Sequence, residues 1–130
     1  MRFASLLLLL LLSTAAGAQI ATDRDVVLDG ESVVGRWTAV EVPTDPGATA
    51  DLARGTLTTV LVINPTGHVI LRGTDTRQGR GAPAAFSGAM AGRRVVFREL
   101  PGTGELARYG RELHLVDPRG RRTVFVRSRR

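Results

Sequence analysis

Short runs of alternating apolar and polar residues, separated by glycine and proline, make up most of this 130-residue chain. Between residues 33 and 40, alternation places Gly35, Trp37 and Ala39 on one face of a strand. Comparable runs recur to the end of the chain, with turn-forming residues between them. The pattern predicts eight strands, over residues 32–42, 56–64, 68–75, 84–90, 93–100, 106–109, 112–116 and 121–127.

The residues between these runs predict tight turns. In 64–67 (Asn-Pro-Thr-Gly) and 117–120 (Asp-Pro-Arg-Gly), proline presets the second turn position and glycine accepts the left-handed one. Residues 43–47 break the first strand, and the alanine-rich stretch 48–54 is expected to form one short helical turn. An even number of strands joined by hairpins favours closure, which removes exposed strand edges. The predicted fold class is all-β, a single eight-stranded antiparallel up-and-down barrel.

Trp37 is the only tryptophan, and a glycine stands two residues before it. A tryptophan buries a large apolar area and needs a partner for its indole N–H. Glycine in a strand often marks close approach of another group. The pair suits a crowded barrel end, and the alternative is an ordinary core tryptophan on a sheet.

The N-terminus has the features of a secretory signal peptide. Arg2 supplies a positive start, residues 6–12 are all leucine, and Ala16-Gly17-Ala18 is a small-residue cleavage site. The chain contains no cysteine, which excludes disulfides and a lipid-modified N-terminal cysteine. We therefore expect a periplasmic or secreted protein. The expected parts are a signal peptide (1–18), an N-terminal extension (19–31) and the barrel (32–128).

Charge is unevenly distributed along the chain. Residues 19–92 carry 6 arginines against 8 acidic residues, whereas residues 93–130 carry 11 arginines against 4. A basic half is compatible with an anionic partner such as an envelope surface. No nucleic acid is expected, because no aromatic residues are interleaved to stack bases. The alternative is a solvated basic face with no partner.

Few residues carry catalytic or metal-binding chemistry. His68 and His114 lie on different predicted strands, so no metal site is expected, and no cofactor either. Glu41 and Asp75 stand at predicted strand ends, where a general acid–base role depends on geometry. We predict that the protein is not an enzyme.

Gly35-Arg36-Trp37 resembles the Gly-x-Trp signature of the lipocalins and wider calycins. Residues 61–68, residues 110–115 and the closing segment 125–127 are similar to small bacterial lipocalin-like domains, so the resemblance covers residues 32–128. In lipocalins the tryptophan sits at the closed end of the barrel, and an arginine of the last strand packs over it. The resemblance gives this role to Arg127, whose guanidinium we expect within about 6 Å of the indole. The chain lacks the Thr-Asp-Tyr loop motif and the C-terminal helix of that family.

The resemblance implies a monomeric barrel that binds a small apolar or amphipathic ligand without catalysis. The alternative is a barrel filled by its own side chains, which acts as an envelope-associated interaction module through its basic C-terminal half. Barrel closure is assigned to Gly35, Trp37 and Arg127. The expected ligand-binding residues of the interior are Trp37, Leu61, Leu71, Phe86, Phe97 and Phe125.

We predict that the mature protein begins at Gln19. Cleavage is expected after Ala18, because a small-residue site follows a short leucine core. N-terminal sequencing of protein purified from its own cells checks this. Retention of Met1 in a membrane fraction would contradict it.

Overall fold

The structure is a computed structural model that describes residues 26–77, 81 and 83–129. The predicted signal peptide, its cleavage site and residues 19–25 of the predicted extension lie outside the described residues. So do residues 78–80 and 82 of the loop expected between the third and fourth strands.

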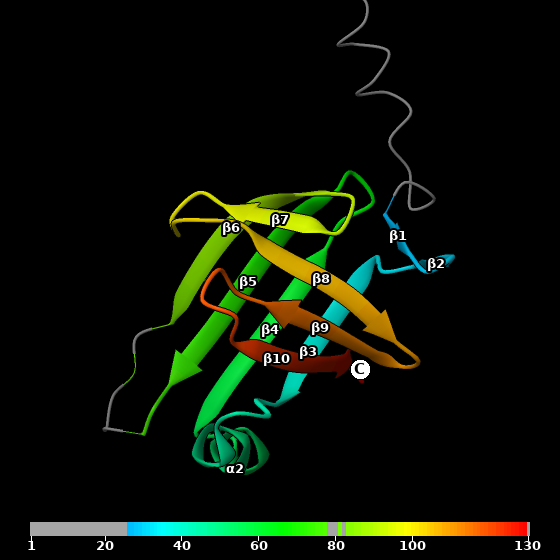
Figure 1. The fold of residues 1–130 in the computed structure, drawn as a ribbon. Coiled ribbons are helices and arrows are strands. Elements are labelled where there is room, and N and C mark those ends of the chain that lie inside the picture. The colour runs from blue at the N-terminus through cyan, green and yellow to red at the C-terminus, as the bar shows by residue number, and fades with distance from the viewer. Residues whose placement is uncertain (1–25, 78–80, 82, 130) are drawn as a thin grey trace, which may run out of the picture.

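Eight antiparallel strands form one closed barrel, which confirms the predicted fold class (Figure 1). Each strand pairs with the next one along the chain, and the last pairs with the first. The sheet therefore has no free edge. The barrel strands are β3 (Gly35–Glu41), β4 (Leu57–Ile63), β5 (His68–Asp75), β6 (Ala84–Ala91), β7 (Arg94–Phe97), β8 (Gly104–Tyr109), β9 (Glu112–Val116) and β10 (Arg122–Arg127).

The predicted turns have the expected geometry. Gly67 and Gly120 have φ angles of 83° and 87°. Their N–H groups each donate to the carbonyl three residues earlier, at 2.9 Å. Both hairpins therefore have a left-handed glycine position that other residues rarely adopt.

Several elements differ from their predicted extent. The strand expected over 32–42 is Gly35–Glu41, because Ser32 pairs in a separate hairpin, and the strand expected over 106–109 begins at Gly104. The expected single helical turn is a nine-residue helix, α2 (Pro46–Arg54), because Asp45 caps it and proline is favourable at the first helical position. The expected strand over 93–100 ends at Phe97 in β7. Two residues later, the Glu99 carboxylate accepts from the Ser87 N–H of β6 at 3.1 Å. Residues 98–103 form a loop between β7 and β8 at the barrel mouth.

A short hairpin precedes the barrel, formed by β1 (Val27–Leu28) and β2 (Glu31–Ser32). Val26, Leu28 and Val33 are buried in the same apolar cluster as the barrel interior. Figure 1 shows the hairpin beside the start of β3. The segment therefore packs against one end of the barrel, here called the closed end.

Trp37 is the centre of the closed end and has no exposed surface. Its indole N–H donates to the Val33 carbonyl at 2.9 Å. The Arg127 guanidinium carbon lies 4.4 Å from the ring centroid, within the expected limit, and that of Arg108 lies 5.9 Å away. Arg127 also donates to the carbonyls of Val34 at 2.6 Å and Ser32 at 2.9 Å. The cation over the indole thus has hydrogen-bond partners as well as an aromatic face.

Gly35 is required by this arrangement for two reasons. Its φ angle is 134°, which L side chains rarely adopt. A Cβ atom at this position would lie 2.6 Å from Nη1 of Arg127. The glycine that stands before the tryptophan therefore provides the space for the arginine.

The half of the barrel next to the closed end is filled by side chains. Trp37, Leu61, Leu106, Leu113 and Phe125 have no exposed surface. Register places Trp37 opposite Leu61 and Phe125 opposite Leu113. Ligand space can therefore exist only toward the other end.

We predict that Arg127→Ala lowers the free energy of unfolding by about 1 to 2 kcal/mol, since it removes the cation–π contact and two hydrogen bonds. Water reaching the indole should shift Trp37 fluorescence to longer wavelength. Urea unfolding and emission spectra check both effects. Arg94→Ala is the matched control on the exposed face of β7. Equal loss of stability in both variants would contradict a specific closing role for Arg127.

Candidate functional site

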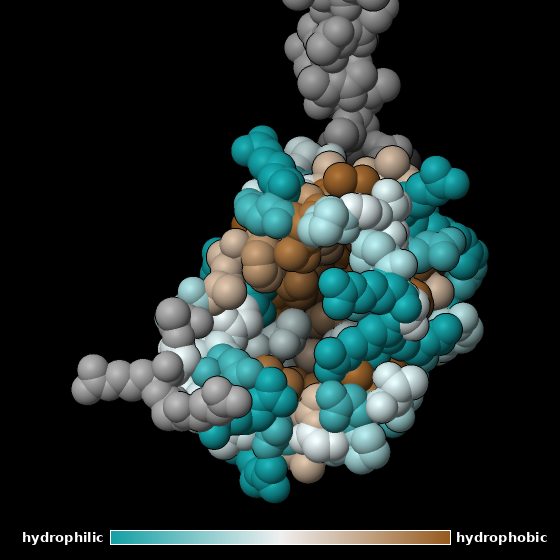
Figure 2. Space-filling model, turned by 60° about the vertical axis from the view of Figure 1, so that its left-hand side comes forward, coloured by the Kyte–Doolittle hydropathy of each residue, from teal (hydrophilic) through white to brown (hydrophobic). Residues whose placement is uncertain are grey.

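An apolar cavity of about 200 Å³ lies at the open end of the barrel, opposite Trp37. Figure 2 shows hydrophobic side chains gathered in a hollow that hydrophilic groups border. Strand ends form its walls, and two loops form its rim. The lining residues are Leu71, Phe97, Leu100, Pro101, Gly102, Gly104, Leu115, Asp117, Pro118, Arg121 and Thr123.

Strand register explains why apolar residues face this cavity. Leu71 pairs with Leu61 on β4 and with Phe86 on β6, so the three share the inner face. Phe97 and Leu115 are also inward and largely buried. The cavity is therefore the unfilled continuation of the core.

The rim depends on a close contact between the two loops. Gly102 has a φ angle of 82°, and a Cβ atom there would lie 2.7 Å from the Pro118 ring. The Asp117 carboxylate accepts from the N–H groups of Arg119 and Arg121, both at 2.9 Å. These bonds hold the β9–β10 turn in place, with Pro118 against the loop after β7.

A second depression, of about 320 Å³ and with a more polar lining, adjoins the apolar cavity. Leu52 from α2 and Arg77 belong to its lining. Asp117, Arg121 and Thr123 line both spaces. The mouth of the barrel thus offers an apolar compartment beside a polar one.

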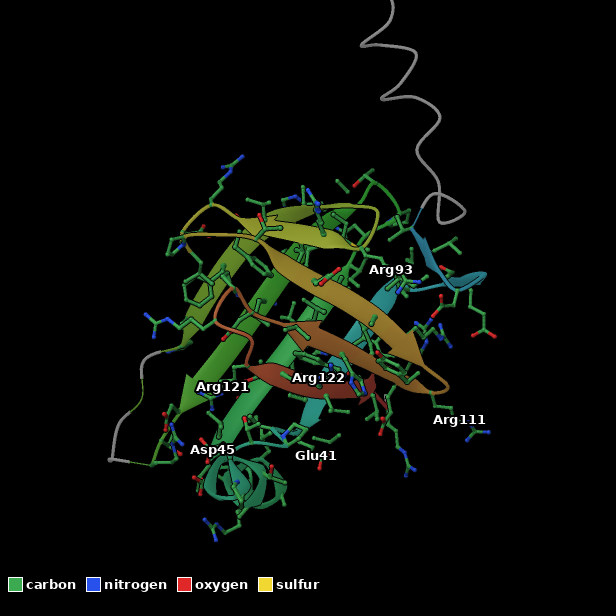
Figure 3. The ribbon with its side chains drawn as sticks, viewed as in Figure 1. Glu41, Asp45, Arg93, Arg111, Arg121 and Arg122 are labelled. Carbon is green, nitrogen blue, oxygen red and sulfur yellow. The ribbon has the colours of Figure 1, made fainter. Side chains whose placement is uncertain are left out.

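Helix α2 closes one side of this mouth. The Asp45 side chain accepts from the Ala48 N–H at 3.0 Å, and Gly55 ends the helix in the left-handed conformation. The Arg121 guanidinium reaches the Asp45 carboxylate at 3.2 Å, and the two side chains lie together beside α2 in Figure 3. Arg121 is half exposed, so this ion pair contributes little to stability. The Arg121 guanidinium could therefore leave Asp45 for another carboxylate.

Arg77 makes ion pairs with two carboxylates at the same end, with Asp75 at 2.5 Å and Asp51 at 3.5 Å. Hydrogen bonds from the Arg77 side chain and backbone lower the pKa of Asp75 to about 2. The pKa of Asp51 is also lowered, chiefly by its hydrogen bond with Arg54. Asp75 is therefore ionised at neutral pH, where it has no proton to donate as a general acid. Glu41, the other expected strand-end acid, is exposed.

The predicted interior residues fall into two groups. Leu71 and Phe97 line the apolar cavity. Trp37, Leu61 and Phe125 lie in the filled core, and Phe86 packs against that core without lining the cavity. The structure thus brings two of the six expected ligand-binding residues to one space.

Several cavity residues were not singled out from the sequence. Leu115 follows Leu113 by two positions, so alternation alone places both on one face. Leu100 is the last residue of the predicted strand 93–100, but β7 ends at Phe97, and Leu100 and Pro101 line the cavity from the loop that follows. Nothing in the sequence indicates that Arg121 stands between the two spaces.

Within the described ranges, no group of three His, Cys, Asp or Glu side chains is placed to hold a metal ion. His68 lies on β5 and His114 on β9. His114 contacts Glu112 and Arg122, at 3.0 Å and 2.9 Å. None of the helices described is long and apolar enough to cross a membrane.

Comparisons with protein-family models, curated proteins and solved structures find no match to this chain. The site must therefore be interpreted from its own geometry.

We predict that the Asp75–Arg77 pair makes stability depend on pH. The folded pKa of about 2 is below the ordinary value of 3.8, so the stabilisation is present above pH 3.8 and is lost as pH falls through about 2. Asp75→Asn should differ most from the parent protein near neutral pH and least near pH 2. Urea midpoints measured across this range check it.

Glu105→Gln is the control, since Glu105 is exposed and has no ion pair in the described part of the chain. A difference between Asp75→Asn and the parent that does not change with pH would contradict the assigned role of the pair.

Proposed function

We propose that this protein is a lipocalin-like binding protein that holds a small amphipathic ligand at the open end of its barrel, without catalysis. The observation that carries the proposal is the apolar cavity that adjoins a polar depression at one mouth, with Arg121 lining both. An apolar group would occupy the cavity, and an anionic or hydrogen-bonding head would face Arg121.

Support for the lipocalin-like interpretation comes from the closed end. The barrel has eight antiparallel strands in sequential order. Trp37 follows a close-contact glycine and lies under an arginine of the last strand. These are the features that the Gly-x-Trp resemblance implies. Export to the periplasm or the medium is a further part of this proposal, and it rests on the sequence of residues 1–18.

The size of the cavity restricts the ligand. Drug-sized ligands occupy pockets of about 300 to 1,000 Å³, whereas an apolar cavity of about 150 Å³ is enough for benzene. At about 200 Å³, this cavity suits a single ring or a short acyl chain. A long-chain lipid would not fit inside it as described.

The rim allows an anionic head group to bind. Arg121 is 51% exposed, and its pair with Asp45 is an exposed one. A ligand carboxylate can therefore replace Asp45 at little cost, with its chain directed past Thr123 into the cavity. Recognition of this kind needs no metal ion.

We predict that the protein binds octanoate more tightly than butyrate, by about four-fold for each added methylene that is buried. The gain should end once the chain exceeds the cavity, so palmitate should bind no better than octanoate. Isothermal titration with the three fatty acids checks this. An equal affinity for butyrate and octanoate would contradict binding of the chain in the cavity.

Two variants test the position of the ligand. Leu71→Trp fills the cavity and should abolish octanoate binding, whereas Val96→Trp, on the exposed face of β7, should leave it unchanged. Arg121→Gln should weaken octanoate binding about ten-fold and leave octanol binding unaffected, because only the carboxylate needs the cation. Native mass spectrometry of protein from its own envelope would show whether a ligand is retained through purification.

A further inference from the structure

Five arginines surround two shallow depressions at the closed end, far from the cavity. One depression, of about 670 Å³, is lined by Arg36, Thr38, Arg127, Ser128 and Arg129. The other, of about 480 Å³, is lined by Arg108, Arg111, Val126, Arg127 and Arg129. No acidic residue lines either one. We call the five arginines the closed-end basic surface.

Two of these arginines are already engaged in the fold. Arg127 donates to backbone carbonyls beside Trp37. Arg108 pairs with Glu31 at 2.6 Å and donates to the Ser32 carbonyl. The Arg127 side chain is exposed and that of Arg108 is only 14% exposed, and the positions of both are fixed by these contacts.

The other three are exposed: Arg36, Arg111 and Arg129. Within the described residues none of them has an ion-pair partner. Arg111 extends outward from the β8–β9 turn (Figure 3). Arg36 points outward from β3, and Arg129 follows the end of β10. Three guanidinium groups are thus presented around one end of the molecule by one strand, one turn and the segment after β10.

An exposed aromatic residue stands beside this surface. Tyr109 is 53% exposed at the end of β8, two positions before Arg111, and one side of its ring packs against His114 and Arg122. A tyrosine with an apolar ring and a polar hydroxyl is typical of the boundary between lipid and water. Arginine forms two parallel hydrogen bonds with a phosphate group. The combination fits phosphate head groups at a bilayer surface, and a soluble polyanion is the alternative that the measurements below separate from it.

We propose that the closed-end basic surface docks the protein on an anionic phospholipid bilayer. The inference is independent of the ligand proposed for the cavity. Docking through the closed end directs the open end away from the bilayer, so that the cavity stays accessible from solvent. Arginines predominate among the outward groups at the docked end, where Glu31 pairs with Arg108, and the guanidinium groups would contact head groups without insertion into the hydrocarbon core.

Sedimentation with vesicles of phosphatidylglycerol mixed with phosphatidylcholine tests the proposal, with pure phosphatidylcholine vesicles as the neutral reference. Each basic residue near an anionic surface contributes about five-fold to binding. A triple variant with Arg36→Gln, Arg111→Gln and Arg129→Gln should therefore lower the partition coefficient about 100-fold. Its thermal unfolding should stay close to that of the parent, because none of the three side chains is part of an ion pair within the described residues.

The matched control removes the same charge elsewhere, through Arg94→Gln, Arg98→Gln and Arg119→Gln. These three arginines are exposed and line neither depression. The control variant should retain most of the vesicle binding. An equal loss in both triple variants would overturn the proposal, because it would show that only net charge matters.

Two further measurements address the alternatives. Tyr109→Ser should weaken binding to anionic vesicles several-fold and leave any binding to a soluble polyanion such as polygalacturonate unchanged. Binding should persist at physiological ionic strength, where charges are screened over about 8 Å. Loss of vesicle binding at that salt would identify a solvated basic face. Tighter binding to polygalacturonate than to vesicles would identify a soluble polyanion as the partner, and either result would overturn the proposal.

Discussion

The contact between Trp37 and Arg127 joins the two ends of the barrel sequence, which are far apart along the chain. The indole donates to Val33, at the entry to the first barrel strand, and the guanidinium belongs to the end of the last strand. The same guanidinium donates to the Ser32 and Val34 carbonyls, which fixes the segment between the N-terminal hairpin and β3. A buried ring, a positive charge and two carbonyl groups satisfy one another there. The barrel can therefore close without leaving a buried polar group unpaired.

The two ends of the barrel differ in how completely side chains fill them. Large side chains fill the barrel around Trp37, whereas at the mouth the loop after β7 and the β9–β10 turn stand around an unfilled apolar space. Gly104 lines this space. A Cβ atom at this position would be crowded, at 3.1 Å from Val95 and 3.3 Å from Leu115. The filled core is thus in one half of the barrel, and the unfilled apolar space is in the other.

The two ends also differ in how their arginines are neutralised. At the mouth, Arg77 and Arg121 face the carboxylates of Asp51, Asp75 and Asp45, so the charges are balanced in place. At the closed end, Glu31 pairs with Arg108, and exposed arginines outnumber carboxylates around the two depressions. Charge that looks like one basic half in the sequence is therefore divided by the fold into a balanced rim and a positive surface.

The sequence by itself determined the barrel and its closing contact. Alternation specifies which face of each strand is inward, and proline–glycine turns such as 64–67 fix hairpins, because both are local properties of a few adjacent residues. The closing roles of Gly35, Trp37 and Arg127 follow from the resemblance of short motifs to the Gly-x-Trp signature. Only the tertiary structure decided where the barrel is hollow, because a cavity is a difference between side-chain volumes contributed by strands far apart in sequence. The partners of Arg121 and Arg77, and the freedom of Arg111, likewise depend on distances across the barrel that no local pattern encodes.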